Sequence, residues 1–114
     1  MEYDANMLKG IVDPIVLKLV SDRAMYGYEI IKVVNERTRG EFEWKEGTLY
    51  PCLHRMECAG LISSKWNEAD NGRKRKYYAI TRKGGALLKE KTNEWTSFTS
   101  AVNAVLLAPN GVFG

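Results

Sequence analysis

Four basic side chains follow one another directly in this sequence, and side chains of this type bind phosphate. They are Arg73, Lys74, Arg75 and Lys76, and they come just after an Asn-Gly pair. Like charges held side by side repel one another, so the arrangement costs free energy unless water or an anion surrounds it. Taken alone, the run fits either a solvated loop or a surface that binds a polyanion.

The distribution of charge along the chain favours the polyanion. The chain has 114 residues and a formal net charge of +3, and the stretch from Asn71 to Leu88 holds six of its 17 basic residues and no acidic one. Outside that stretch the 14 acidic residues outnumber the basic ones, so the rest of the protein is net acidic. A basic patch on an otherwise acidic body is the electrostatic pattern expected of a nucleic-acid-binding protein.

The sequence offers little for catalysis or for metal binding. His54 is the only histidine, there is no Cys-x-x-Cys pair, and we find no phosphate-binding loop and no nucleophile motif. We therefore expect no enzyme activity, no catalytic residue, no metal and no cofactor. Cys52 and Cys58 are too far apart on one helix to form a disulfide bond, which suits a reducing compartment.

The composition is that of a soluble globular domain. Hydrophobic residues make up 45% of the chain and charged residues 27%, close to the averages for such proteins. No stretch approaches the roughly 18 apolar residues of a membrane helix, and the N-terminus lacks a basic start followed by an apolar run. We therefore expect a cytoplasmic protein without a membrane partner.

Apolar residues recur at helical spacing near the N-terminus, which predicts two helices. The first covers residues 4–20. It either kinks at Pro14 or follows a short lead-in that precedes a helix starting nearby, and we favour the kink. The second covers residues 26–39 and ends at Gly40, because a glycine adopts the left-handed conformation of a helix end at little cost.

A third helix is predicted after a very short strand at residues 42–44. It begins at Gly47 or Thr48, because Pro51 belongs close to a helix N-terminus, and it ends at Gly60. One of its faces is apolar. The residues that can reach outwards or shape the start of the helix are Thr48, Tyr50, Pro51, His54 and Arg55.

Beyond Gly60 the period of the apolar pattern changes from 3.6 to 2, which predicts two strands. Asn71-Gly72 supplies the turn between them. The resulting hairpin carries residues 73–76 at or beside its tip, away from the core. A basic hairpin tip of this kind can lie on a DNA backbone or enter the minor groove.

The last helix is predicted to run from an N-cap at Thr81 to about Leu107, which is longer than so small a domain needs. Its apolar residues follow a heptad pattern that Lys91 interrupts. An exposed seam of this kind is a liability on a monomer, so we expect it to pair with a second copy of the chain. The predicted dimerisation residues are Leu88, Trp95, Phe98, Val102 and Val105.

The order of these elements predicts a mainly α fold with a small β-hairpin, namely a winged helix-turn-helix followed by a long helix. We expect a winged-helix DNA-binding domain over residues 1–81, a C-terminal dimerisation helix over residues 82–107 and a tail over residues 108–114. In such a fold the third helix is the candidate reader of the major groove.

Three segments of the sequence resemble the signature of PadR-like transcriptional regulators in order and spacing: YGYEIIK, EGTLYPCLHRMECAGLISSKW and GRKRKYYAITRKG. With its single C-terminal helix the chain resembles the short subgroup of that family. The resemblance implies a dimeric, ligand-responsive repressor that binds operator DNA. Two departures are Lys74, where many relatives have proline, and Met56, where leucine is commoner.

Carried over by motif, the resemblance implies a set of DNA contacts on the second and third helices and the hairpin. For Tyr50 the alternative is simple packing at a helix start, and for His54 it is an ordinary surface histidine. The set is Tyr28, Gly47, Thr48, Tyr50, Pro51, His54, Arg55, Arg73, Lys74, Arg75 and Lys76.

The resemblance also suggests a slot for a small planar apolar or aromatic effector, formed by Met7, Ile15, Trp95 and Phe98. Trp95 would equally serve as dimer core alone. The alternative function for the whole chain is a winged-helix protein-docking or RNA-binding module without operator specificity, because a fold does not fix a function.

Overall fold

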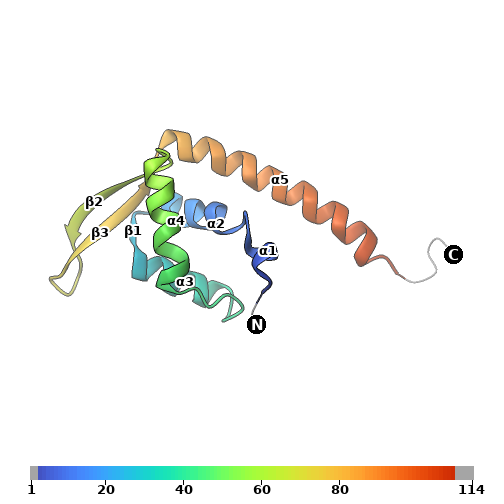
Figure 1. The fold of residues 1–114 in the computed structure, drawn as a ribbon, viewed down its shortest axis with the longest axis horizontal. Helices are drawn as coiled ribbons and strands as arrows, with labels where there is room; N and C mark the ends of the chain where they lie inside the picture. The colour runs from blue at the N-terminus through green and yellow to red at the C-terminus, as the bar shows by residue number, and fades with distance from the viewer. Residues whose placement is uncertain (1–2, 110–114) are drawn as a thin grey trace.

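The computed structural model describes residues 3–109 of the chain, in which short helices pack together, a small antiparallel sheet projects from them on one side and one long helix extends away on the other (Figure 1). This arrangement confirms the predicted fold class. The predicted tail falls largely outside the described residues, as residues 110–114 are not among them. The elements are α1 (Ala5–Leu8), α2 (Val12–Asp22), β1 (Met25–Tyr26), α3 (Gly27–Arg37), α4 (Glu46–Cys58), β2 (Ile62–Glu68), β3 (Lys74–Ile80) and α5 (Arg82–Leu106).

The predicted kink at Pro14 is wrong, and the alternative of a short lead-in is observed. The lead-in is α1, which ends before Gly10, whose φ of +87° lies in the left-handed region. A new helix, α2, then begins at Val12, so Pro14 is its third residue. No helical partner is lost there, because the first turn has no internal acceptor for its N–H groups.

The predicted strand at residues 42–44 is also wrong, because its backbone N–H groups bond to side chains of α3. The N–H of Phe42 donates to Thr38 Oγ1 at 3.0 Å, and the N–H of Trp44 donates to Asn35 Oδ1 at 3.0 Å. The segment is thereby held as a loop. Gly40 has a φ of +79°, as expected where α3 stops.

The sheet takes its third strand from β1 instead, which has only two residues and lies at the edge beside β3. In the hairpin, Ser64 pairs with Tyr78 and Trp66 pairs with Lys76. Because side chains alternate between the faces of a strand, these residues share one face of the hairpin. The predicted hairpin is confirmed, and its two strands lie on either side of Asn71-Gly72, as expected.

The core lies where α2, α3, α4 and the base of the sheet meet. The residues of the core are Val16, Leu17, Leu19, Val20, Met25, Ile30, Val34, Trp44, Leu49, Cys52, Leu53, Met56, Leu61, Ile62 and Tyr78.

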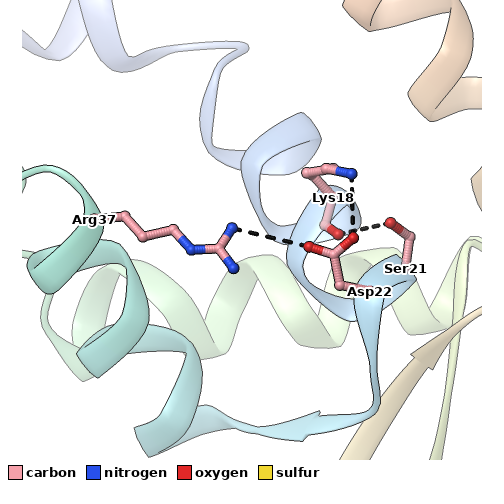
Figure 2. Close-up of polar contacts among 4 residues, drawn as sticks. All are labelled: Lys18, Ser21, Asp22 and Arg37. Carbon is pink, nitrogen blue, oxygen red and sulfur yellow. Dashed lines mark hydrogen bonds and ion pairs between the residues drawn. The ribbon is translucent and has the colours of Figure 1, made fainter.

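At the surface, an ion-pair cluster connects the end of α2 to α3. Asp22 accepts a hydrogen bond from Lys18 at 3.1 Å and forms an ion pair with Arg37 at 3.9 Å (Figure 2).

The long helix α5 begins against the hairpin base and then leaves the body. Its predicted N-cap is confirmed, because Thr81 Oγ1 accepts from the N–H of Gly84 at 3.0 Å. Gly84 lies very close to the loop between α4 and β2, so that a Cβ there would be 2.0 Å from the Leu61 carbonyl oxygen. After packing against α2, the helix extends away on the side opposite the hairpin (Figure 1), and the molecule measures 63 × 29 × 22 Å.

Candidate nucleic-acid interface

The helix α4 buries one face and exposes the other. Its buried side chains, among them Leu49 and Leu53, anchor it in the core. The outward residues predicted from the sequence, Thr48, Tyr50, Pro51, His54 and Arg55, are all exposed, and so is Gly47. An anchored helix with a polar outer face has the geometry needed to enter a major groove.

The position of Pro51 differs from the prediction. The helix begins at Glu46, so Pro51 is its sixth residue and lies beyond the first turn. Proline has no N–H, so the Gly47 carbonyl lacks its usual helical donor. Both residues are exposed, and water can hydrogen-bond to that carbonyl.

The ring of Tyr50 packs over the start of α3. A Cβ added to Gly27 would lie 2.7 Å from Tyr50 Oη, so only glycine leaves room for this contact. The side chain is nevertheless 44% exposed. Tyr50 therefore packs at a helix start, as the alternative supposed, and also keeps part of its ring exposed, as does Tyr28, which is 60% exposed at the start of α3. The DNA contact of Tyr50 stays a prediction.

On the side of α4 that faces α2, Arg55 is held by Asp13. Its Nη1 and Nη2 atoms lie 2.7 Å from the two carboxylate oxygens, and the Cys52 thiol lies 3.0 Å from Oδ1. The hydrogen bonds from Arg55 lower the pKa of the Asp13 carboxyl below its usual value. Burial, together with the neighbouring Asp13, raises the pKa of Cys52 to about 12. The thiol is therefore neutral and the Arg55 guanidinium already has a partner.

On the opposite side, α4 is tied to the hairpin through Glu57. Lys76 Nζ lies 3.3 Å from Glu57 Oε1, and the Ser64 hydroxyl donates to Oε2. The hydrogen bond from Ser64, with that from Lys76, lowers the pKa of the Glu57 carboxyl. Lys76, predicted as a DNA contact, thus also fixes the angle between helix and hairpin.

The basic run at the hairpin does not form a single patch. Arg73 lies in the turn, where its N–H donates to Asn71 Oδ1 at 3.0 Å, and the strand β3 begins at Lys74. Strand alternation places Lys74 and Lys76 on the face that meets α4 and Arg75 on the other. There the Arg75 guanidinium lies 5.4 Å from the centre of the Tyr26 ring. Arg73 and Lys74 are therefore the exposed members of the basic run.

Two residues in this region were not singled out from the sequence. Asp13 is one, because no local pattern reveals a partner for Arg55 that lies in another helix. The other is Trp66, whose indole is 66% exposed on the hairpin. The predicted hairpin already carried residues 73–76 away from the core, and Trp66 pairs with Lys76, so the strand register could have revealed its exposure.

A groove of about 770 Å³ lies between α5 and the segment that holds α1 and the start of α2. Met7, Trp95 and Phe98 line it, three of the four predicted effector contacts, and the two aromatic ring centres are 6.4 Å apart. Ile15 does not line this groove, because it packs against the core. The complete lining is Asp4, Asn6, Met7, Lys9, Gly10, Ile11, Pro14, Lys91, Glu94, Trp95, Phe98 and Val102.

Among residues 3–109 no group of three or more His, Cys, Asp or Glu side chains is placed to hold a metal ion. In the same residues, no helix combines the length and apolar character needed to cross a membrane.

Comparison with known proteins places these features in context. Residues 16–90 match the sequence model of the Transcriptional regulator PadR-like family. The chain is 35% identical over 99 residues to Uncharacterized protein X of Lysinibacillus sphaericus, covering 87% of this chain and 91% of that protein. It is 41% identical over 58 residues to Transcriptional regulator Rv3488 of Mycobacterium tuberculosis, covering 51% of this chain and 53% of that protein. The crystal structure of a PadR-like transcriptional regulator from Bacillus cereus is similar, with a TM-score of 0.81 and 34% identity over 92% of this chain and 100% of that chain.

Proposed function

This chain belongs to the PadR-like transcriptional regulator family, and from that premise we propose that it is a dimeric, ligand-responsive repressor that binds operator DNA. The family, the relative from Mycobacterium tuberculosis and the structure from Bacillus cereus are those of transcriptional regulators and not of enzymes. The observation that carries the proposal is the placement of α4, whose exposed polar face lies beside the basic hairpin and away from the core.

In the proposed complex α4 enters the major groove. Gly47, in the exposed first turn, brings a backbone N–H group to a phosphate and Thr48 brings its hydroxyl, because the N–H of Thr48 already donates to the Lys45 carbonyl. His54 reaches base edges from the middle of the exposed face. Tyr28 and Tyr50 offer hydroxyl groups to the backbone. Arg73 and Lys74 at the hairpin tip bind phosphates of the neighbouring backbone, and this contribution to affinity falls as salt rises.

The proposed dimer is formed by α5. Trp95, Phe98 and Val105 are exposed on a helix that leaves the body of its own chain. Pairing with a second copy would remove this apolar surface from water and set the distance between two α4 helices. A dimer bound to its operator would repress transcription by blocking the promoter, and this needs no additional protein-binding surface.

The proposed effector binds in the groove beside α5. Its volume is within the range of small-molecule pockets, about 300 to 1,000 Å³, and Trp95 and Phe98 offer flat apolar faces. The groove lies against the start of α2, which also carries Asp13. A ligand that shifts α2 would therefore also move Asp13, and through its contact with Arg55 it would change the position of α4.

The experiment that tests this function is selection from a random duplex DNA pool, with the affinity of the enriched sequences then measured against salt. Enrichment of a two-fold symmetric site, with half-sites about one or two helical turns apart, is the expected result. A variant with Arg73→Ala and Lys74→Ala should bind every sequence more weakly. The control Lys89→Ala, which removes one positive charge exposed on α5, should bind as the wild type does.

The same selection separates the alternatives. Salt-sensitive binding without enrichment would instead support a non-specific or RNA-directed module. No binding to any duplex would mean that the hairpin serves a protein partner, and the operator-binding proposal would be wrong.

A further inference from the structure

Trp66 is a large apolar side chain that the fold leaves in water. Its indole is 66% exposed in the middle of β2, although strands of this sheet bury other aromatic side chains such as Tyr78. The exposed aromatics of α5 border the groove or follow the heptad seam. Trp66 belongs to neither, because the hairpin and the free part of α5 lie on opposite sides of the molecule (Figure 1).

The neighbours of Trp66 give its surroundings a definite charge. It pairs across the hairpin with Lys76, and Lys74 is the next residue of β3 on the same face, opposite Glu68. Arg73 follows at the turn. Lys76 is paired with Glu57, whereas Arg73 and Lys74 have no carboxylate within ion-pair distance among residues 3–109, so these two are the free positive charges beside the indole.

This face of the hairpin is also the one that meets α4. Ser64, two residues before Trp66 on the same face, hydrogen-bonds Glu57 of α4, and Lys76 forms an ion pair with the same carboxylate. Trp66 is the next residue outwards along β2. It therefore lies just past the edge of α4, where the backbone of a duplex held by α4 would continue.

We propose that Trp66 is a DNA-contacting residue whose indole packs against the deoxyribose of the strand that the hairpin follows, while Lys74 binds the adjacent phosphate. This inference rests on the DNA-binding function proposed above. An aromatic ring supplies apolar contact with sugar or base without pairing with a phosphate, and it tolerates any sequence. Positive charge beside the ring complements the strand and argues against a basic or neutral protein partner.

Removing Lys74 and removing Trp66 should change the DNA affinity in ways that depend differently on salt concentration. A lysine that binds a phosphate releases a counterion, so Lys74→Ala should reduce the slope of log affinity against log salt by about one. An indole on a sugar releases none. Trp66→Ala should therefore weaken binding by about tenfold at every salt concentration and leave the slope unchanged, whereas Trp66→Phe should retain most of the affinity.

The experiment measures the affinity of the full-length wild type, Trp66→Ala, Trp66→Phe and Lys74→Ala for one selected duplex over a range of salt. Iodide quenching of a Trp95→Phe protein provides the second readout, at DNA concentrations at which that protein is shown to bind the duplex. In that protein Trp66 is the exposed tryptophan and Trp44 is buried, so bound DNA should protect most of the quenchable emission.

Wild-type affinity for Trp66→Ala, together with weakened binding for Lys74→Ala, would overturn the inference and leave the proposed function intact. Absence of duplex binding by the wild type would remove the proposed function itself. If Trp66→Ala is destabilised, the quenching experiment decides: unchanged iodide access in the presence of DNA would overturn the proposal, and protection would support it.

Discussion

At the scale of single residues, the two cysteines differ sharply in their surroundings. Cys52 is buried beside Asp13, and its pKa is raised to about 12, whereas Cys58 is exposed at the end of α4. Because the thiolate is the reactive form, iodoacetamide at neutral pH should modify Cys58 and spare Cys52. Peptide mapping by mass spectrometry measures this, and the Cys58→Ser protein should react only after unfolding. Equal rates at both thiols in the native protein would contradict the assigned burial.

Asp13 should make stability depend on pH in the acid range. Its folded-state pKa is lowered by Arg55, so the ionised carboxylate stabilises the fold above the unfolded pKa near 4, and this stability is lost as pH falls through the lower folded value. Because Arg55 is exposed to water, the contribution is at most about 1 kcal/mol. Asp13→Asn should be less stable at neutral pH and should lose less stability on acidification.

Urea unfolding at several pH values between neutral and about pH 3 measures both effects. Glu94→Gln is the matched control, because Glu94 is an exposed carboxylate paired with Lys91 on α5. Parallel pH profiles for wild type and Asp13→Asn would show that the pair contributes nothing measurable to folding.

At the scale of elements, the junction between the hairpin base and α5 depends on Gly84. A Cβ there would meet the Leu61 carbonyl at 2.0 Å, and backbone cannot move aside cheaply. Gly84→Ala should therefore destabilise the protein by about 1 to 3 kcal/mol or more. The adjacent Gly85 has nothing within 4 Å of its Cβ position, so Gly85→Ala should be neutral or stabilise the helix by up to about 1 kcal/mol.

Denaturant unfolding of both variants gives the comparison. A similar free energy of unfolding for the two proteins would mean that α5 can shift away from the loop without cost, and that its direction is not fixed by this contact.

The sequence predicted the long elements well because each has several periods of its pattern. Helix α5 begins after Thr81 and ends one residue before the expected Leu107, and the hairpin strands lie where alternation placed them. Apart from the start of α4, the errors fall on segments with fewer than five residues. Met25 and Tyr26 are too few to show alternation, and residues 42–44 do alternate but donate their hydrogen bonds to α3.

The site was predicted as a set of residues but not as a network. Motif and helical spacing located the exposed face of α4, because spacing determines which side chains share a face. The partners of that helix come from elsewhere in the chain: Asp13 is 42 residues from Arg55, and Lys76 of the hairpin pairs with Glu57 of α4. Such tertiary pairs have no local signature, since nothing in the periodicity of one element specifies which neighbour it will meet.

At the scale of the whole molecule, the groove beside α5 should respond to planar ligands. Trp95 lines it and is half-exposed, so a flat aromatic dye that enters should quench its emission. The Trp95→Phe protein retains Trp44 and Trp66 and should show little response to the same dye. An unchanged signal across a panel of planar dyes would remove the support for an effector at this place.

The oligomeric state is also a property of the whole molecule. Val105 is 77% exposed on the seam of α5 and does not line the groove, so it reports on pairing and not on ligand binding. Burying a new carboxylate in an apolar seam without a partner is costly. Val105→Asp should therefore weaken self-association at least tenfold, as measured by sedimentation across a dilution series.

Ser100→Asp is the matched control, because position 100 lies on the opposite face of α5 from the seam and should tolerate a charge. If the wild type and both variants sediment alike as monomers, α5 does not form the dimer. If Val105→Asp alone is monomeric, its affinity for a two-fold symmetric operator should also fall, because each α4 must then bind its half-site without a tethered partner and loses the gain in effective concentration that a dimer provides.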